Sequence, residues 1–361
     1  MSVNAIAQPP ASTNIARAKE RLADRSTPFI TDCWYVAGWG KDFTRDLCER
    51  TLLGRSLVLY RRTDGQPVAL QNRCPHRSFP LASGKLEGDV LRCGYHGIAF
   101  NANGSCAEIP TQNVVPRNVC VPSYPLAERG PFVWIWMGDR AAADESKIPD
   151  TSWLTSAEWS YATNYLALKG SYVYLHENLL DLSHFTYLHP TTLGTPEYAQ
   201  TPFDVDVQHD KVRITRRVPE CDVPPIYART GIKGKMSRHT TSEFVSPAVH
   251  HASALLADLD ASPRDRKDFT IYITHFLTPE SQGQTHYWFA FARDFAINDQ
   301  EASDYMGAGA LTAFNEDKLA LEAISRIYAL EPEAASAEFH IKSDQAGVAM
   351  RRILHRRAEG K

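Results

Sequence analysis

Short hydrophobic runs of the β type, interrupted by Gly, Pro and Asn, occupy the chain between residues 33 and 137. They are SLVLYRR at 56–62, PVALQNR at 67–73, VLRCGYHGIAF at 90–100 and FVWIWM at 132–137. NANGS at 101–105 has the residues of a tight hairpin turn between two such runs. Short strands joined by turn residues predict a small antiparallel β domain in this part of the chain.

The second half of the chain mixes two hydrophobic periodicities. Apolar residues recur at helical spacing over 171–190 and 311–330. Alternating or continuous apolar runs at 211–218, 268–277 and 285–293 are typical of strands. This half therefore predicts an α+β domain with an antiparallel sheet and at least two long helices.

A polar, alanine-rich stretch, GDRAAADESKIPD at 138–150, separates the two halves. The length of 361 residues also exceeds the usual size of one domain. We therefore expect an N-terminal tail with a short helix over 1–29, a β domain over 30–148 and the α+β domain over 149–361.

Composition narrows the classes of function. Hydrophobic residues make up 43% and charged residues 22%, the net charge is −3, and no run of Lys and Arg stands out. These values do not favour a nucleic-acid or anionic-membrane partner. No apolar run is long enough to cross a bilayer, the N-terminus has no signal-peptide core, and the seven cysteines are sparse. We expect a cytoplasmic protein without membrane attachment or a disulfide framework.

Two cysteines and two histidines lie in the stretch CPHRSFPLASGKLEGDVLRCGYHG at 74–97. Cys74 with His76, and Cys93 with His96, place one sulfur and one nitrogen ligand in each of two loops. A structural zinc ion would accept the same four ligands, but zinc fingers pair like with like. One thiolate and one imidazole per loop is the ligand set of a Rieske [2Fe–2S] cluster. The stretch closely resembles the Rieske motif.

A second group of polar residues follows in NLLDLSHFTYLHP. On a helix the three-residue steps would keep Asn178, Asp181 and His184 near one face. His189 precedes a proline, where a helix must end, so its imidazole can turn back toward His184. Two histidines with a carboxylate from elsewhere form the facial triad of non-haem Fe(II) oxygenases.

The missing carboxylate is expected on a buried helix face near the C-terminus. Phe314, Asp317, Leu321, Ile324 and Tyr328 fall on one stripe of 3.6-residue period. Asp317 is then a lone acid on an apolar face, which is costly unless it meets a cation. Glu316 and Glu322 lie on flanking faces and are expected to be solvated. Glu316 is the alternative ligand if Asp317 is wrong.

Over nearly its whole length the chain resembles the oxygenase components of Rieske non-haem iron oxygenases, in the branch of vanillate and dicamba O-demethylases. The stretches that carry this resemblance are NLLDLSHFTYLH at 178–189, THFLTPE at 274–280 and EDKLALEAI at 316–324. It implies an N-terminal Rieske domain, a C-terminal domain of the helix-grip (START/Bet v 1-like) type and a head-to-tail homotrimer.

The resemblance also implies roles for single residues. In the family an Asp matching Asp181 bridges an iron-ligand His, here His184, to a cluster His of the neighbouring subunit, here His96. Asn178 is a catalytic candidate beside it. Respiratory Rieske proteins carry an extra disulfide between the two loops, but the matching residues here are Phe79 and Tyr95, as in the oxygenase branch.

The activity implied is that of a terminal oxygenase that uses O₂. GAGALT at 307–312 lacks the third glycine and the preceding strand of a nucleotide-binding loop. Electrons from NAD(P)H must therefore come through a partner reductase, with or without a ferredoxin. The expected reaction is O-demethylation of a small aromatic substrate with release of formaldehyde, or hydroxylation.

Three alternatives remain open at this point. They are an N-demethylase, a ring-hydroxylating dioxygenase and, in another class, a Rieske electron-transfer protein without oxygenase activity. In the expected pocket, Ile271, Ile273 and His275 share a strand face, and the branch uses a His matching His275 to hold the substrate. Where the branch can carry a Trp, this chain has Ala308 or another small residue, which predicts a wider pocket.

Overall fold

The computed structural model describes residues 22–262, 268–331 and 338–360. Most of the tail, with the helix expected there, lies outside these ranges, and residues 22–29 form turns and extended chain. The C-terminal half contains one antiparallel sheet in the order β11-β17-β16-β15-β14-β13-β12. Its strands are β11 (Ser160–Leu168), β12 (Phe203–Gln208), β13 (Lys211–Asp222), β14 (Lys235–Ser246), β15 (Val249–Asp258), β16 (Asp268–Ser281) and β17 (Gln284–Arg293).

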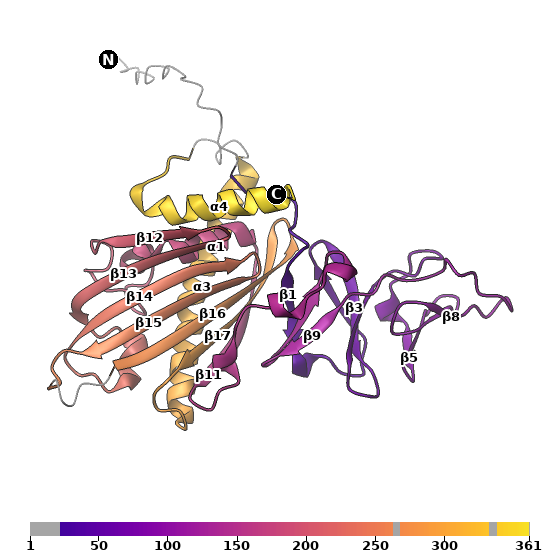
Figure 1. The fold of residues 1–361 in the computed structure, drawn as a ribbon, viewed down its shortest axis with the longest axis horizontal. Helices are drawn as coiled ribbons and strands as arrows, with labels where there is room; N and C mark the ends of the chain where they lie inside the picture. Colours follow the sequence, from indigo (N-terminus) through magenta and orange to yellow (C-terminus); the bar gives the residue numbers. More distant parts are fainter. Residues whose placement is uncertain (1–21, 263–267, 332–337, 361) are drawn as a thin grey trace, which may run out of the picture.

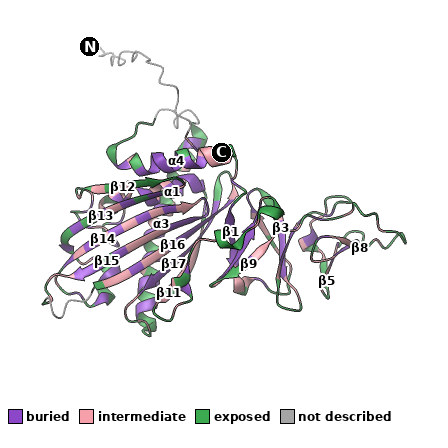
Figure 2. Ribbon diagram, viewed as in Figure 1, coloured by how far each residue is buried: buried purple, intermediate pink, exposed green. Residues whose placement is uncertain are grey.

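Four α-helices accompany this sheet (Figure 1). They are α1 (Tyr172–Leu180), α2 (Phe185–Leu188), α3 (Gln300–Leu330) and α4 (Gln345–Ala358). Helix α3 packs against β11 and β17, and α1 lies between α3 and α4. Buried and exposed residues alternate along β13 and β14, so these strands present one face to the helices and the other to solvent (Figure 2). The expected α+β fold is confirmed.

Three smaller antiparallel sheets form the N-terminal half, in the orders β1-β10-β9, β2-β3-β4 and β5-β6-β7-β8. The strands are β1 (Trp34–Trp39), β2 (Cys48–Leu52), β3 (Arg55–Arg61), β4 (Pro67–Gln71), β5 (Lys85–Glu87), β6 (Val90–Arg92), β7 (Ala99–Phe100), β8 (Cys106–Glu108), β9 (Leu126–Arg129) and β10 (Phe132–Trp136). The hairpin turn expected at 101–105 joins β7 to β8, and Gly104 has the positive φ, +85°, that such a turn requires.

One hydrophobic core joins the first of these sheets to the large sheet. Phe276 of β16 packs on Phe132 and Trp134 of β10, with ring centroids 4.5 and 5.5 Å apart. Thr278 of the same strand donates its hydroxyl hydrogen to the carbonyl of Val36 in β1 at 2.8 Å. The two halves are thus fixed against each other by packing as well as by hydrogen bonds.

The β5–β8 sheet has a core of its own and lies at the far end of the molecule from the large sheet (Figure 1). Its core includes Leu81, Leu91, Phe100 and the two motif cysteines, Cys74 and Cys93. The expected division of the chain near residue 148 falls between β10 and β11, among short 3₁₀ turns, and stays a prediction.

Two sequence expectations about helices are wrong. The helix expected over 171–190 is broken: α1 ends at Leu180, a 3₁₀ turn η6 (Leu182–His184) follows, and α2 ends at Leu188. The helix expected over 311–330 begins earlier, at Gln300, because Asp299 caps it by accepting from the Ala302 N–H at 3.0 Å. GAGALT therefore lies inside a helix and forms no nucleotide loop.

All seven cysteines are free thiols, in agreement with the expectation that there is no disulfide framework. Among the described residues, no helix is both long enough and apolar enough to span a membrane.

The shared core predicts a large loss of stability for Phe276→Ala. Phe276 is fully buried between the two sheets, so its truncation should lower the free energy of unfolding by about 3–5 kcal/mol. Urea denaturation followed by circular dichroism measures the change. The matched control is Phe339→Ala, because Phe339 is 83% exposed and its loss should cost about 0.5 kcal/mol or less. If both variants lowered the free energy of unfolding by a similar small amount, Phe276 would not be a main contributor to the packing between the two sheets.

Candidate active site

The two motif loops have the same backbone architecture. Each motif cysteine, Cys74 or Cys93, donates its N–H to the carbonyl five residues later, at 2.9 and 2.8 Å. Each cysteine carbonyl in turn accepts from the N–H four residues later, that of Ser78 at 2.9 Å and that of Gly97 at 3.1 Å. Ser78 and Gly97 both have positive φ, 56° and 74°, which turns the chain back over its own cysteine. The sequence therefore folds two equivalent ligand loops side by side.

These loops hold sulfur inside and nitrogen outside. Cys74 and Cys93 are 2% exposed, whereas His76 and His96 are exposed with ring centroids 4.6 Å apart. Burial raises the pKa of the Cys74 thiol, and the neighbouring Cys93 thiol adds to the rise. Two thiols at the core and two imidazoles at the surface fit a cluster whose irons take sulfur on one side and nitrogen on the other.

Phe79 and Tyr95 face each other across the two loops. Their ring centroids are 5.7 Å apart, and Tyr95 also packs against the His96 ring at 3.9 Å. An aromatic contact therefore joins the two loops at these positions.

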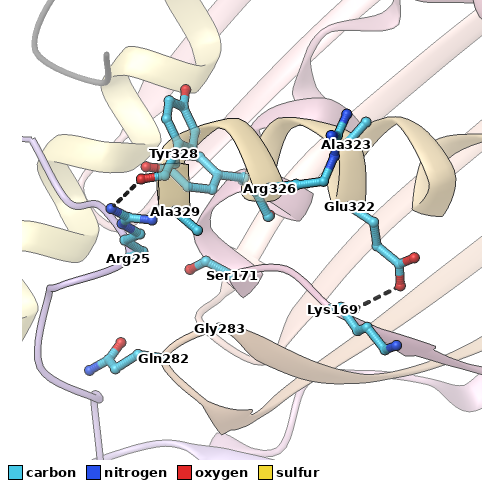
Figure 3. A pocket seen from close by; sticks show the side chains of 12 residues that line it. Arg25, Lys169, Ser171, Gln282, Gly283, Glu322, Ala323, Arg326, Tyr328 and Ala329 are labelled. Atoms are coloured by element: carbon cyan, nitrogen blue, oxygen red, sulfur yellow. Dashed lines mark hydrogen bonds between the residues drawn. The ribbon is translucent and has the colours of Figure 1, made fainter. Parts of the chain in front are cut away.

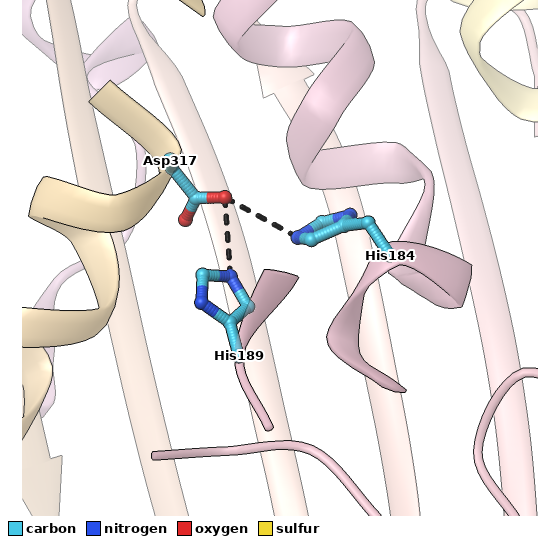
Figure 4. A group of neighbouring side chains, drawn as sticks. All are labelled: His184, His189 and Asp317. Carbon is cyan, nitrogen blue, oxygen red and sulfur yellow. Dashed lines mark hydrogen bonds and ion pairs between the residues drawn. The ribbon is translucent and has the colours of Figure 1, made fainter. Parts of the chain in front are cut away.

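The second constellation also comes together in space. Figure 4 shows the His184 and His189 rings directed at the Asp317 carboxylate. His184 Nε2 lies 3.3 Å and His189 Nε2 3.1 Å from Asp317 Oδ1, and one potential ligand atom from each residue lies within 4.8 Å of the others. Asn178 Nδ2 donates to the same Oδ1 at 3.1 Å. Two imidazoles and one carboxylate are the donor set of a mononuclear non-haem iron site.

Hydrogen bonds on the far side of each ring fix the imidazole orientation. His184 Nδ1–H donates to the Asp181 carbonyl, and His189 Nδ1–H donates to Glu316 Oε2 at 2.7 Å. Both Nε2 atoms are then left as metal donors. His184 Nε2 is buried and has no hydrogen-bond partner among the described residues, as expected for an atom that faces a metal position.

Asp317 is the electrostatic centre of this group. It is only 4% exposed, and burial by itself would raise the pKa of its carboxyl. The contacts with His184 and His189 outweigh burial and hold that pKa well below its usual range. Burial lowers the pKa of His189, but Asp317 and Glu316 together raise it above the ordinary value. A cation held between both Nε2 atoms and Asp317 would meet the expectation that this acid needs one.

The break in the helix explains how both histidines reach one point. Asp181 Oδ1 accepts from Ser183 N–H at 3.0 Å and from Ser183 Oγ–H at 2.6 Å, which ends α1 and caps the next turn. Asp181 and His184 therefore do not share a continuous helix face with Asn178, contrary to the expectation. Asp and Ser compete with helical hydrogen bonds in this way.

Glu316 corrects a second expectation. It is not simply solvated: its Oε2 accepts from His189 Nδ1–H and from Thr192 Oγ1–H, the latter at 3.0 Å. Glu322 accepts from the Lys169 backbone N–H at 2.9 Å, away from the group. Glu316 thus orients the His189 ring, a role that no pattern in the sequence indicates beyond its place next to Asp317.

A narrow cavity is lined in part by His184 and Asp317. Its walls combine apolar side chains, among them Leu182, Phe185 and Phe314, with a few polar ones. Ile273 and His275 line it from β16, as expected. His275 Nδ1 is 2.7 Å from Tyr287 Oη, and burial lowers its pKa to about 3, so the ring is neutral. The remaining nitrogen, Nε2, is then free to donate.

Two further expectations about α3 are wrong. Ala308 is exposed and does not line this cavity, so it provides no ground for a wider pocket. Ile324 is 44% exposed, whereas the other four members of the predicted stripe are buried. Ile324 lies at one edge of this stripe, and Tyr328, one turn later, is still buried.

A more open hollow lies at the C-terminal end of α3 (Figure 3). Arg25 donates to the Tyr328 carbonyl at 2.8 Å on one side of it, and Lys169 N–H bonds Glu322 on the other. Its described lining contains no His and no Cys, so the candidate metal chemistry lies elsewhere.

Comparison with known proteins gives matches over both halves. The Rieske [2Fe-2S] domain model matches residues 33–125, and the model of the vanillate O-demethylase oxygenase C-terminal domain matches residues 168–360. The iron-sulfur subunit of the toluene-4-sulfonate monooxygenase system of Comamonas testosteroni is 37% identical, covering 84% of this chain and 90% of that protein. The dicamba O-demethylase oxygenase component of Stenotrophomonas maltophilia is 30% identical, with coverages of 91% and 97%.

Among solved structures, dicamba monooxygenase bound to dicamba superposes with a TM-score of 0.84 at 28% identity. The match covers 92% of this chain and 98% of that one.

Glu316→Gln should weaken the hold on a metal at His184, His189 and Asp317. Removing the carboxylate charge behind His189 is expected to lower Fe(II) affinity by about 10- to 100-fold. Fe(II) bound at equilibrium against a competing chelator measures this. Glu322→Gln, on the same helix but away from the group, is the control and should leave the affinity unchanged. Equal Fe(II) affinities for both variants would show that Glu316 does not contribute to metal binding.

Proposed function

Because this chain belongs to the Rieske oxygenase family of the vanillate O-demethylase oxygenase components, we propose that it oxidises a small aromatic substrate, by O-demethylation with release of formaldehyde. It is the oxygenase component of a multicomponent monooxygenase system and carries one Rieske [2Fe–2S] cluster and one mononuclear iron. A ferredoxin or an NAD(P)H-dependent reductase supplies the electrons in this proposal.

The observation that carries the proposal is the convergence of His184, His189 and Asp317 beside a mainly apolar cavity, whose wall includes His184 and Asp317. We assign the mononuclear iron to these three residues, through Nε2 of each ring. In the same assignment, Cys74 and Cys93 would hold one iron of the cluster, and His76 and His96 would hold the other. When bound, the iron supplies O₂ activation, and the cluster supplies single electrons.

The chain's own residues position the reactants and exclude water. Apolar cavity walls keep bulk solvent from the reacting methyl group. Asn178 Nδ2–H holds Asp317 Oδ1, which fixes the carboxylate against the two rings. His275, neutral and held by Tyr287, offers an N–H donor to a polar group of the substrate. A pure electron carrier would need none of these groups.

Electrons pass between subunits in this proposal. The cluster loops lie at the opposite end of the molecule from α1 and α3 (Figure 1), while His96 is exposed and available to a neighbour. A head-to-tail homotrimer would bring His96 of one subunit to Asp181 of the next. Asp181 Oδ1 caps η6, and its Oδ2 has no partner among the described residues, so it is available for this contact.

A substrate panel tests the reaction. The purified enzyme with a surrogate reductase and NAD(P)H should release formaldehyde from at least one methoxy-substituted aromatic compound. His184→Ala should abolish release while the visible spectrum of the cluster persists, and iron should fall from about three to about two per chain. Diols or simple alcohols without formaldehyde would overturn the demethylase proposal. Loss of both spectrum and activity in His184→Ala would mean that the two metal sites are misassigned.

Asp181→Asn tests the route between subunits. Asn keeps the cap on η6 but removes the charge, so turnover should fall by about 10- to 100-fold while both metals stay bound. Single-turnover mixing of the reduced enzyme with O₂ and substrate should show slow oxidation of the cluster. Asp144→Asn is the matched control for Asp181→Asn. Asp144 Oδ1 accepts from the Ser146 N–H and hydroxyl at 2.9 and 2.7 Å, as Asp181 Oδ1 does from Ser183. Equal turnover in both variants would exclude Asp181 from electron transfer.

A further inference from the structure

Strand β14 presents a polar stripe to the interior of the catalytic half. Arg238, Thr240 and Ser242 are buried, while the residues between them are partly exposed. The inward positions of such a strand are normally apolar. All three side chains line the cavity that also contains His184 and Asp317.

The Arg238 guanidinium is buried without a counter-charge. The residue is 2% exposed, and it makes no ion pair with a carboxylate in the described part of the chain. Nη1 donates to the Leu193 carbonyl at 2.9 Å and Nη2 to Tyr227 Oη at 3.0 Å, while Nε has no acceptor. Phe185, Tyr198 and Tyr227 surround the charge, with ring centroids 4.9–5.4 Å from Cζ. The rings hold the guanidinium in place and leave donor capacity unused.

Thr240 adds a second unused group in the same wall. It is 4% exposed, and its Oγ1 has no hydrogen-bond partner among the described residues. Ser242, by contrast, donates to the Leu179 carbonyl at 2.7 Å. A buried polar group without a partner costs free energy, so a cavity wall with two of them is suited to a polar ligand.

An unpaired nitrogen alone does not identify a binding site. Arg216 is also buried, with Nε and Nη2 unpaired, but it does not line the cavity. Arg238 differs because it does line the cavity, beside Thr240. Asp317 is the only acidic residue among the described lining residues, and it is assigned to the iron. The cavity therefore contains a fixed positive charge that no side chain neutralises.

We propose that the substrate carries a carboxylate or sulfonate group, which Arg238 and Thr240 bind inside the catalytic cavity. This inference rests on the proposed function, since it concerns the substrate of that same site. A planar guanidinium donates two parallel hydrogen bonds to either oxyanion, and the threonine hydroxyl can donate a third. An aromatic acid anchored at β14 has its other end inside the cavity that adjoins the metal ligands.

Calorimetric titration of the purified enzyme with matched ligand pairs tests this. The pairs are para-methoxybenzoate against para-methoxybenzamide, and para-methoxybenzenesulfonate against its sulfonamide. In at least one pair the anion should bind about 10-fold or more tightly than the neutral ligand, because its hydrogen bonds are charge-assisted. The pair with the larger ratio identifies the oxyanion. Ratios near one, or below one, in both pairs would overturn the proposal without any mutant.

Variants locate the effect. Arg238→Met should bring the anion-to-neutral ratio close to one, and Arg216→Met, the matched buried arginine outside the cavity, should leave it unchanged. Thr240→Val keeps the shape, removes only the hydroxyl and should lower anion affinity several-fold. It decides the question if Arg238→Met does not fold, as judged by circular dichroism and thermal unfolding. A ratio unchanged in both Arg238→Met and Thr240→Val would refute the assigned site.

The two proposals can fail separately. Release of formaldehyde from neutral methoxyarenes, with no preference for anions in binding, would support the proposed function and contradict the anion site. Tight, Arg238-dependent binding of the acids without formaldehyde from any compound would support the anion site and contradict the proposed demethylation.

Discussion

The buried carboxylate of Asp317 is the constraint around which the catalytic half is built. A carboxylate removed from water is unstable unless cations or donors reach it. Three separate pieces of chain reach it here: Asn178 from α1, His184 from η6 and His189 from the end of α2. No continuous helix could present all three to one oxygen, so the break at Asp181 is a requirement of the site. At this break Asp181 Oδ1 accepts from the Ser183 N–H and from the Ser183 hydroxyl.

The length of α3 follows from the same constraint. Asp317 must lie deep in the fold, where α3 crosses the sheet near β11 and β17, and the helix therefore begins more than four turns before it. Glu316, one position earlier, faces His189 from the other side. The helix thus supplies both the ligand and the carboxylate that orients another ligand.

What could be predicted from the sequence was local in character. The spacing of Cys74, His76, Cys93 and His96 is enough to predict their arrangement, because each Cys and His pair lies within one short loop. Asp317 could be found because a buried acid on an apolar helix face is unstable unless a cation or a hydrogen-bond donor contacts it. The role of Glu316 depends on where His189 and Thr192 arrive after folding, and the exposure of Ala308 depends on how α3 meets the sheet. Neither is encoded in periodicity.

Strand β14 shows the limit of hydrophobic patterning most clearly. KMSRHTTSEFVS is polar at both alternating sets of positions between Met236 and Phe244, so the sequence offers no way to tell which face is buried. The register is instead set by the apolar ends, Met236 and Phe244, which both point inward. That register forces Arg238, Thr240 and Ser242 into the interior between them. A fold that needed only stability would fill these positions with apolar residues. Their polarity is therefore better explained by what the cavity binds than by what holds the sheet together.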